Sequence, residues 1–169
     1  MRNLVKPEVY DKLHGEEQYV KYNCIVNHGV VFKGTIIDIG CGTGLLYEFI
    51  EKQQRAFKGR YICIDPDEKM LKIARKKLNT PLAILVKSRA EELPIRSDSG
   101  DVVVSISTWG LLEKTLSLLR EFKHVARKTG AVVITGHPRT YDVSPSDLDS
   151  DFKFIDSCID NIYMYRKES

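Results

Sequence analysis

The chain has 169 residues, of which 43% are hydrophobic and 29% are charged, and its formal net charge is +3 at pH 7. This length suits a single domain with one sizeable core, and so small a charge does not require a nucleic-acid partner. No apolar run reaches the roughly 20 residues that cross a bilayer, and the amino terminus lacks a hydrophobic signal core. We therefore expect a cytoplasmic protein without a membrane partner.

The leading residues are expected to form a lid. Residues 1–34 carry an apolar set at helical spacing, and residues 35–169 then form the core of the same single domain. The set consists of Val9, Leu13, Val20, Cys24 and Val31. So short a lid can cover only a small area, so we expect the edge of the domain core beneath it to stay open to solvent.

A glycine ladder is the most informative feature of the chain. The apolar strand 35–39 runs into Gly40, Gly42 and Gly44, and a helical pattern follows. Glycines let a backbone turn tightly and approach a ligand closely. The third glycine comes one residue earlier than in the G-x-G-x-x-G dinucleotide fingerprint. The alternative interpretation is an ordinary strand-to-helix turn.

An acidic residue ends the next apolar strand, residues 61–65. Asp65 is followed by Pro66 and by helical spacing over residues 70–78. A carboxylate about 20 residues beyond a glycine loop can accept hydrogen bonds from both hydroxyls of a ribose. The alternative role is a helix cap, for which Asp67 is the better candidate.

A third stretch, residues 90–107, joins Ala-Glu-Glu-Leu-Pro-Ile to another apolar strand. Together the three stretches resemble the class I, Rossmann-like S-adenosylmethionine-dependent methyltransferases, and in particular their small type 11 members. The glycine loop of that family reads D-x-G-x-G-x-G, as it does here from Asp38 to Gly44. The resemblance extends from about Ile36 to Lys167.

Strands alternate with helical patterns, which favours an α/β fold with a doubly wound, mostly parallel sheet. The resemblance implies seven strands, an antiparallel terminal strand and helices on both faces. Strands are expected near residues 35–39, 61–65, 82–87, 102–106, 131–135, 151–155 and 162–166. An amphipathic helix is expected over residues 115–128, ended by Thr129 and Gly130.

The resemblance also implies the cofactor, S-adenosyl-L-methionine, which becomes S-adenosyl-L-homocysteine. Asp38 would orient its methionine end and Asp65 would hold its ribose. The implied cofactor-binding residues are Asp38, Gly40, Cys41, Gly42, Gly44, Asp65, Pro66, Ala90, Glu91 and Ser107. Arg89 stands where the family usually has an aspartate that accepts from adenine. Because arginine cannot accept, that contact must be lost, supplied by the backbone or moved to Glu91.

The resemblance names no catalytic residue, because positioning an activated methyl donor supplies most of the acceleration. His137 is a candidate base if the acceptor must lose a proton, although a lone histidine is more often structural. Trp109 could line an acceptor pocket or pack in the core. The methyl acceptor is unknown. The open edge favours a protein or RNA acceptor, or an activating partner subunit that completes the site.

Two other functions stay open. One is a methyltransferase-like domain that is catalytically weak or inactive and acts as a ligand-binding or partner protein, for which Arg89 is the reason. The other is a nicotinamide-dependent oxidoreductase, which the glycine spacing fits less well.

The four cysteines, Cys24, Cys41, Cys63 and Cys158, show no C-x-x-C spacing. Neither disulfides nor a metal site are therefore expected. Cys41 is interpreted as a small residue of the glycine loop rather than a nucleophile.

Overall fold

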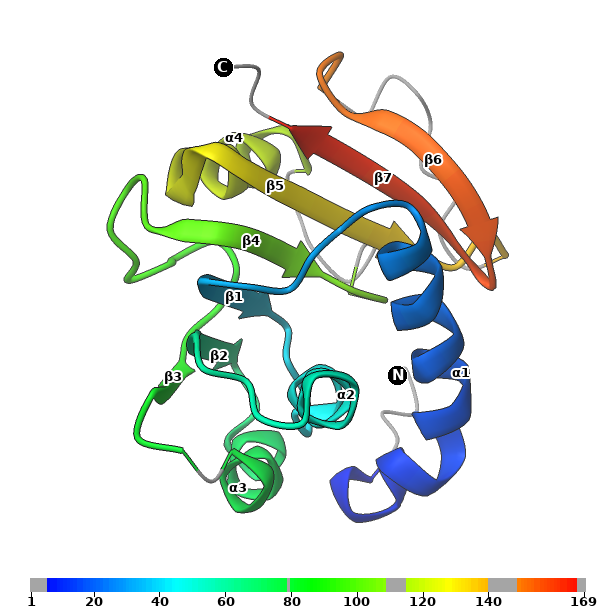
Figure 1. Ribbon diagram of the computed structural model, residues 1–169, viewed down its shortest axis with the longest axis vertical. Helices are drawn as coiled ribbons and strands as arrows, with labels where there is room; N and C mark the ends of the chain where they lie inside the picture. The colour runs from blue at the N-terminus through cyan, green and yellow to red at the C-terminus, as the bar shows by residue number, and fades with distance from the viewer. Residues whose placement is uncertain (1–5, 79, 109–114, 140–148, 167–169) are drawn as a thin grey trace.

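A computed structural model describes residues 6–78, 80–108, 115–139 and 149–166 (Figure 1). A seven-stranded sheet with the order β3-β2-β1-β4-β5-β7-β6 runs through the molecule. The strands are β1 (Thr35–Ile39), β2 (Arg60–Asp65), β3 (Ala83–Lys87), β4 (Gly100–Ser105), β5 (Ala126–Gly136), β6 (Lys153–Cys158) and β7 (Asp160–Arg166). Strands β1 to β5 pair in parallel, and β7 is antiparallel to both of its neighbours. The predicted fold class is confirmed.

Helices cover both faces of the sheet. The four described helices are α1 (Pro7–Asn27), α2 (Leu45–Gln54), α3 (Glu68–Lys77) and α4 (Thr115–Val125). Ile36 of β1 faces the core under α1, α2 and α3, whereas its neighbour Ile37 faces the core under α4. Every residue of β1 is buried, as expected of a central parallel strand. No described helix is both long and apolar enough to cross a membrane.

The sequence prediction for the end of α4 is wrong. A helix was expected to continue to Lys128, but α4 ends at Val125 and β5 begins at Ala126, which pairs with Gly100 of β4. The guanidinium of Arg127 donates to Asp101 Oδ1 at 2.9 Å. Strand pairing and this ion pair therefore override the helical periodicity of the segment.

The apolar set of the leading residues does not form the buried face of α1. Of the apolar set, Cys24 is buried, but Leu13 is 61% exposed, and Val9, Val20 and Val31 are exposed too. The buried residues of α1 are Gln18, Lys21, Tyr22, Cys24 and Ile25. Polar side chains face inward here because α1 lies against the polar edge of the sheet, where the parallel strands end (Figure 1).

One buried ion pair fixes the carboxyl-terminal half of α1 to the sheet. Lys21 is 2% exposed and Asp160, the first residue of β7, is fully buried. Lys21 Nζ lies 3.0 Å from Asp160 Oδ1 and donates to Ser107 Oγ at 2.9 Å and to Glu17 Oε1 at 2.7 Å. Asp160 Oδ2 accepts from Thr135 Oγ1 at 2.7 Å. A buried charge without its partner is strongly unfavourable, so this network determines where α1 lies.

The structure contains two disulfides, which corrects the expectation of none. Cys24 of α1 is bonded to Cys158 of β6, and Cys41 of the glycine loop is bonded to Cys63 of β2. The Cα atoms lie 6.4 Å apart in the first pair and 5.4 Å in the second. The partners are far apart in the sequence, so spacing motifs did not indicate them. Strand pairing and the packing of α1 bring them together.

We predict that Lys21→Met lowers the free energy of unfolding by about 3–5 kcal/mol, because Asp160 keeps a buried charge without its partner. Urea unfolding followed by circular dichroism measures this loss. Lys12→Met is the matched control, since Lys12 is an exposed lysine of the same helix, and its effect should stay within about 0.5 kcal/mol. Equal stabilities of the two variants would show that the pair does not anchor α1.

Candidate functional site

The glycine loop lies at the carboxyl edge of the sheet, between β1 and α2. Gly40, Gly42 and Gly44 all have positive φ, at 77°, 54° and 79°. A Cβ on Gly40 would lie 2.3 Å from Thr108 Cγ2, whereas at Gly42 nothing lies within 4 Å. Only glycine therefore fits at position 40, and the backbone at Gly42 borders open space, where a ligand can approach it.

Asp65 connects this loop to the end of β2. Its Oδ2 accepts from Gly42 N at 2.9 Å, and its Oδ1 accepts from Asp67 N at 2.8 Å. Burial raises the pKa of the Asp65 carboxyl, and these two hydrogen bonds oppose the shift. A carboxylate offers about four acceptor positions, so Asp65 can still accept from two ligand hydroxyls. Asp67 caps α3 by accepting from Lys69 N at 2.8 Å, as predicted.

Asp38 is the second carboxyl group beside the loop. It is 3% exposed, and its Oδ2 accepts a hydrogen bond from the hydroxyl of Tyr61. Burial raises the pKa of Asp38 to about 7, although the Tyr61 hydrogen bond opposes the rise and the Asp65 charge adds to it. The carboxyl therefore titrates near neutral pH, and a nearby cation would favour its charged form.

The cavity beside the loop is small, at about 30 Å³. Its lining comes from α1, β1, the loop, α2 and the end of β4: Tyr10, Gln18, Tyr22, Asp38, Gly40, Cys41, Gly42, Thr43, Leu45, Leu46 and Ile106. A volume of ~30 Å³ is about that of one water molecule, whereas pockets for larger ligands measure ~300–1,000 Å³. A nucleoside-sized ligand would therefore have to displace part of α1.

The amino-terminal half of α1 covers this cavity with Tyr10, and one acidic residue connects it to the glycine loop and to α3. Asp11 accepts from the hydroxyl of Thr43 in the loop and also forms an ion pair with Lys77 of α3. The side chain of Asp11 is 37% exposed, so solvent competes for both contacts. These contacts are weaker than the buried Lys21 pair. Opening of the amino-terminal half is thus the least costly way to admit a ligand.

The residues predicted to lie beside adenine follow β3 at the same edge. Ala90 is buried in the core under α4. Pro66, another predicted cofactor-binding residue, directly follows β2 and is exposed. Arg89 is 66% exposed, and its Nε lies 3.5 Å from Glu91 Oε2. The guanidinium therefore contacts the very carboxylate that could replace the missing aspartate.

The side chain of Ser107 forms hydrogen bonds within the buried network of Lys21 and Asp160, and Ser107 is not part of the cavity lining. With φ at 58°, it donates from its hydroxyl to Asp160 Oδ2 at 2.8 Å, and its backbone N donates to Thr135 Oγ1 at 2.9 Å. Gln18 Nε2 reaches the same hydroxyl at 3.2 Å. Sequence reasoning missed this network, since no motif connects a helix, a strand end and the start of β7.

His137 lies just beyond β5. Its Nδ1 accepts from Arg139 N at 3.2 Å, and the residue is not part of the cavity lining. Cys41, in contrast, lines the cavity while it is bonded to Cys63, so it has no free thiol in this structure. Trp109 lies outside the described residues.

Comparisons with known proteins agree with this geometry. Residues 37–134 match the family described as a methyltransferase domain. The uncharacterized methyltransferase YdaC of Bacillus subtilis is 23% identical over 135 residues, which are 80% of this chain and 74% of YdaC. A structure from Methanococcus maripaludis, described as an S-adenosyl-L-methionine-dependent methyltransferase (mmp1179), matches with a TM-score of 0.76 and 18% identity, over 96% of this chain and 90% of that one.

A further match is the complex of the Haloferax volcanii Trm112 methyltransferase activator with its methyltransferase, at a TM-score of 0.67 and 19% identity. It covers 76% of this chain and 56% of that one. The family match spans more than half of the chain and includes the glycine loop, Asp65 and the strands around them. The chain therefore belongs to the class I, S-adenosylmethionine-dependent methyltransferases.

Proposed function

We propose that this chain transfers a methyl group from S-adenosyl-L-methionine to an acceptor. The observation that carries the proposal is the open space at Gly42, beside a cavity that Asp38 lines, with Asp65 hydrogen-bonded to Gly42 N. The donor supplies an activated methyl group on a sulfonium, so the protein need only bind it, orient it and exclude water. These are tasks that a glycine loop, two carboxylates and a covering helix can perform.

Each carboxyl group suits a different end of the donor. Asp65 has free acceptor positions for two ribose hydroxyls, and Gly42 N holds its Oδ2 in place at 2.9 Å. Asp38 is buried beside the loop and favours a cationic group such as the ammonium of the methionine end. Tyr61 orients Asp38 by donating to its Oδ2. In this proposal Asp65 accepts hydrogen bonds from the ribose hydroxyls, and Asp38 pairs with the positive charge of the methionine end.

The covering helix supplies the exclusion of water. Tyr10, Gln18 and Tyr22 of α1 line the cavity from the side opposite the loop. Closure of such a cover over a bound donor would hold it in line with the acceptor. His137 is the residue that we propose as a base for an acceptor that must lose a proton.

A second function, ligand binding without efficient transfer, has one specific observation in its favour. Arg89 occupies the position of the usual adenine acceptor, and Glu91, its possible replacement, is already in contact with it at 3.5 Å. A protein that binds the donor weakly could act through a partner instead. Methyl transfer remains the main proposal because the glycine loop and the nearby carboxyl groups of Asp38 and Asp65 support donor binding.

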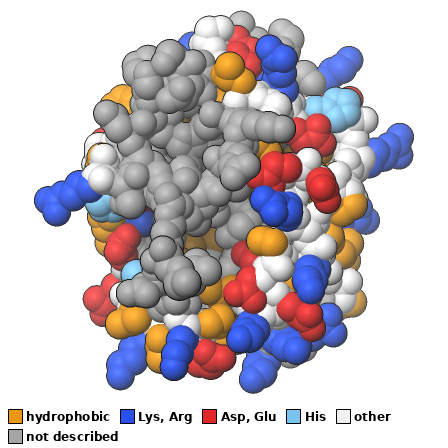
Figure 2. Space-filling model, turned by 180° about the vertical axis from the view of Figure 1, so that it is seen from behind, with side chains coloured by type: hydrophobic (Ala, Val, Ile, Leu, Met, Phe, Trp, Pro, Cys, Tyr) orange, Lys and Arg blue, Asp and Glu red, His pale blue; other side chains and the backbone are white. Residues whose placement is uncertain are grey.

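The acceptor that we propose is a protein or RNA rather than a small metabolite. The edge was expected to be open, but in the structure α1 covers the glycine loop and leaves a cavity of only about 30 Å³. A donor must therefore displace part of α1, and a macromolecular acceptor would help to close the site that this movement opens. From behind, basic and acidic side chains alternate over the described surface, without a broad area of one sign (Figure 2). A partner subunit is an alternative cover. The exposed apolar side chains Val9, Leu13 and Val20 of α1 and the likeness to the Trm112 complex support it.

We predict that Asp65→Ala weakens binding of S-adenosyl-L-methionine at least about tenfold, because two charge-assisted hydrogen bonds are lost. Isothermal titration calorimetry measures the affinity. Asp67→Asn is the matched control, since it removes a neighbouring exposed charge but keeps an oxygen that can cap α3. Unchanged affinity in the Asp65 variant would exclude this carboxylate from the site.

The affinity for S-adenosyl-L-methionine should rise as the pH rises through about 7 and then level off. Asp38 carries a proton below that pKa, and a cationic ligand requires its charged form, so binding releases a proton. Calorimetry in buffers with different ionisation enthalpies counts the protons released. Asp38→Asn should abolish the rise, and an identical pH profile in this variant would assign the titration to another group.

The stability of the unliganded protein should show the opposite trend. Because burial raises the pKa of Asp38 from 3.8 in the unfolded chain to about 7, the folded state binds the proton more tightly. The contribution of Asp38 to stability therefore falls as the pH rises from about 4 to 7. Asp38→Asn should flatten this part of the curve in urea unfolding.

The acceptor class can be tested directly. Incubation of the enzyme with donor labelled in the methyl group and a size-fractionated cell extract should place label in protein or RNA. Protease and ribonuclease treatment of the labelled fraction then separates the two. Label confined to small molecules would refute the macromolecular acceptor, and no label in any fraction with tight donor binding would favour the non-enzymatic function.

A further inference from the structure

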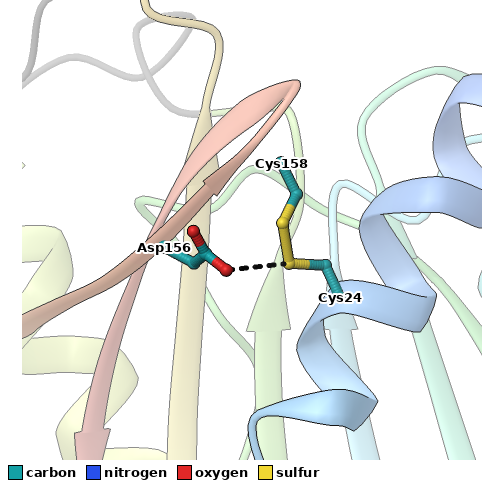
Figure 3. Close-up of side chains that lie close together, drawn as sticks. All are labelled: Cys24, Asp156 and Cys158. Carbon is teal, nitrogen blue, oxygen red and sulfur yellow. Dashed lines mark hydrogen bonds between the residues drawn. A yellow bond between two sulfur atoms is a disulfide. The ribbon is translucent and has the colours of Figure 1, made fainter.

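A cluster of metal-ligating side chains lies where α1 meets β6 (Figure 3). Cys24 lies in the last turn of α1, and His28 is the residue that caps the carboxyl end of the same helix. Asp156 and Cys158 are two residues apart on β6, so they share one face of the strand. The end of α1 and this face of β6 meet: Asp156 Oδ2 lies 3.8 Å from Cys24 Sγ and 2.7 Å from His28 Nε2.

The ligand atoms are close enough for one ion. The Sγ atoms of Cys24 and Cys158 and a carboxylate oxygen of Asp156 all lie within 4.8 Å of one another. In a tetrahedral zinc site, with Zn–S near 2.3 Å and Zn–O near 2.0–2.2 Å, ligand atoms stand roughly 3.4–3.8 Å apart. Small side-chain rotations would therefore bring the three atoms to the spacing that one ion requires.

We propose that the reduced chain binds one Zn²⁺ ion through the thiolates of Cys24 and Cys158 and the carboxylate of Asp156. Two thiolates select a soft or borderline ion such as Zn²⁺ over Mg²⁺ or Ca²⁺. His28 holds the carboxylate in place through its Nε2 atom, as partners of ligating carboxylates do in metal sites. The side chains of His28 and Asp156 are 36% and 45% exposed, so an ion can enter from solvent.

Zinc binding and the disulfide exclude each other. In this structure the two sulfurs are bonded, and a dithiol or phosphine reductant must supply two electrons to break the S–S bond. Two protons complete the two thiols, and the ion then displaces both protons as it binds the thiolates. The disulfide and the ion would each tie the end of α1 to β6, so this connection survives in either redox state.

The second cysteine pair offers no such site. Cys41 and Cys63 are both buried, and among the described residues no histidine or carboxylate joins them in a group that could hold an ion. A divalent ion at that position would lack the third ligand that Asp156 supplies to the first pair. The Cys41 pair therefore serves as an internal control for thiol chemistry.

The test uses the purified chain, reduced with a phosphine and kept free of oxygen, with Co²⁺ as a spectroscopic probe and Zn²⁺ as its competitor. Thiolate-to-cobalt charge-transfer absorption should saturate at one ion per chain, and one equivalent of Zn²⁺ should abolish it. The oxidised chain should give no such absorption. Absence of the absorption from the reduced chain would overturn the proposal.

Variants assign the ligands. Cys158→Ser should lose most of the absorption, and Asp156→Asn should keep it but weaken Co²⁺ binding at least about tenfold. The double variant Cys41→Ser, Cys63→Ser and the exposed-acid variant Asp151→Asn should bind Co²⁺ like the unmodified chain. Circular dichroism shows whether Cys158→Ser folds. If it does not, the test rests on Asp156→Asn, because Asp156 is partly exposed and its replacement should leave the fold intact. An unchanged affinity of Asp156→Asn for Co²⁺ would refute the site.

Discussion

The buried pair of Lys21 and Asp160 is the contact on which the ligand edge depends. Neither charge reaches solvent, so each must stay beside the other for the chain to remain folded. Lys21 lies in the carboxyl-terminal half of α1, Asp160 begins β7, and Ser107, two residues beyond β4, contacts both. Three segments that are far apart in the sequence are thereby held at the edge where the glycine loop lies.

This anchor divides α1 into two halves with different stability. The carboxyl-terminal half is held by Lys21 and by the bond from Cys24 to β6, while the amino-terminal half is held through the partly exposed Asp11. Local opening follows the weaker contacts, so entry of a ligand should move the amino-terminal half around a fixed centre. Because this half can move, a cavity that is small in the closed arrangement can still admit a nucleoside. The proposed metal site would strengthen the half that does not move.

The sequence predicted the features that depend on local pattern. Strand β1, its glycine loop, Asp65 at the end of β2 and the cap at Asp67 follow from hydrophobic runs and turn chemistry within a few residues. The polar buried face of α1, the early start of β5 at Ala126 and both disulfides depend on long-range pairing. Periodicity assumes that a helix buries its apolar side, and that assumption fails for a helix that packs on a polar edge.

The two carboxyl groups beside the loop also discriminate between classes of ligand. Asp65 is close enough to Asp38 for its charge to raise the pKa of Asp38, so this edge of the sheet disfavours a further negative charge. A dinucleotide would bring an anionic pyrophosphate to the glycine loop, where it would meet this field. S-adenosyl-L-methionine instead carries a sulfonium and an ammonium against a single carboxylate, and this net positive charge relieves the repulsion. Electrostatics therefore favours a methyl donor over a nicotinamide cofactor at this edge, independently of the spacing of the glycines.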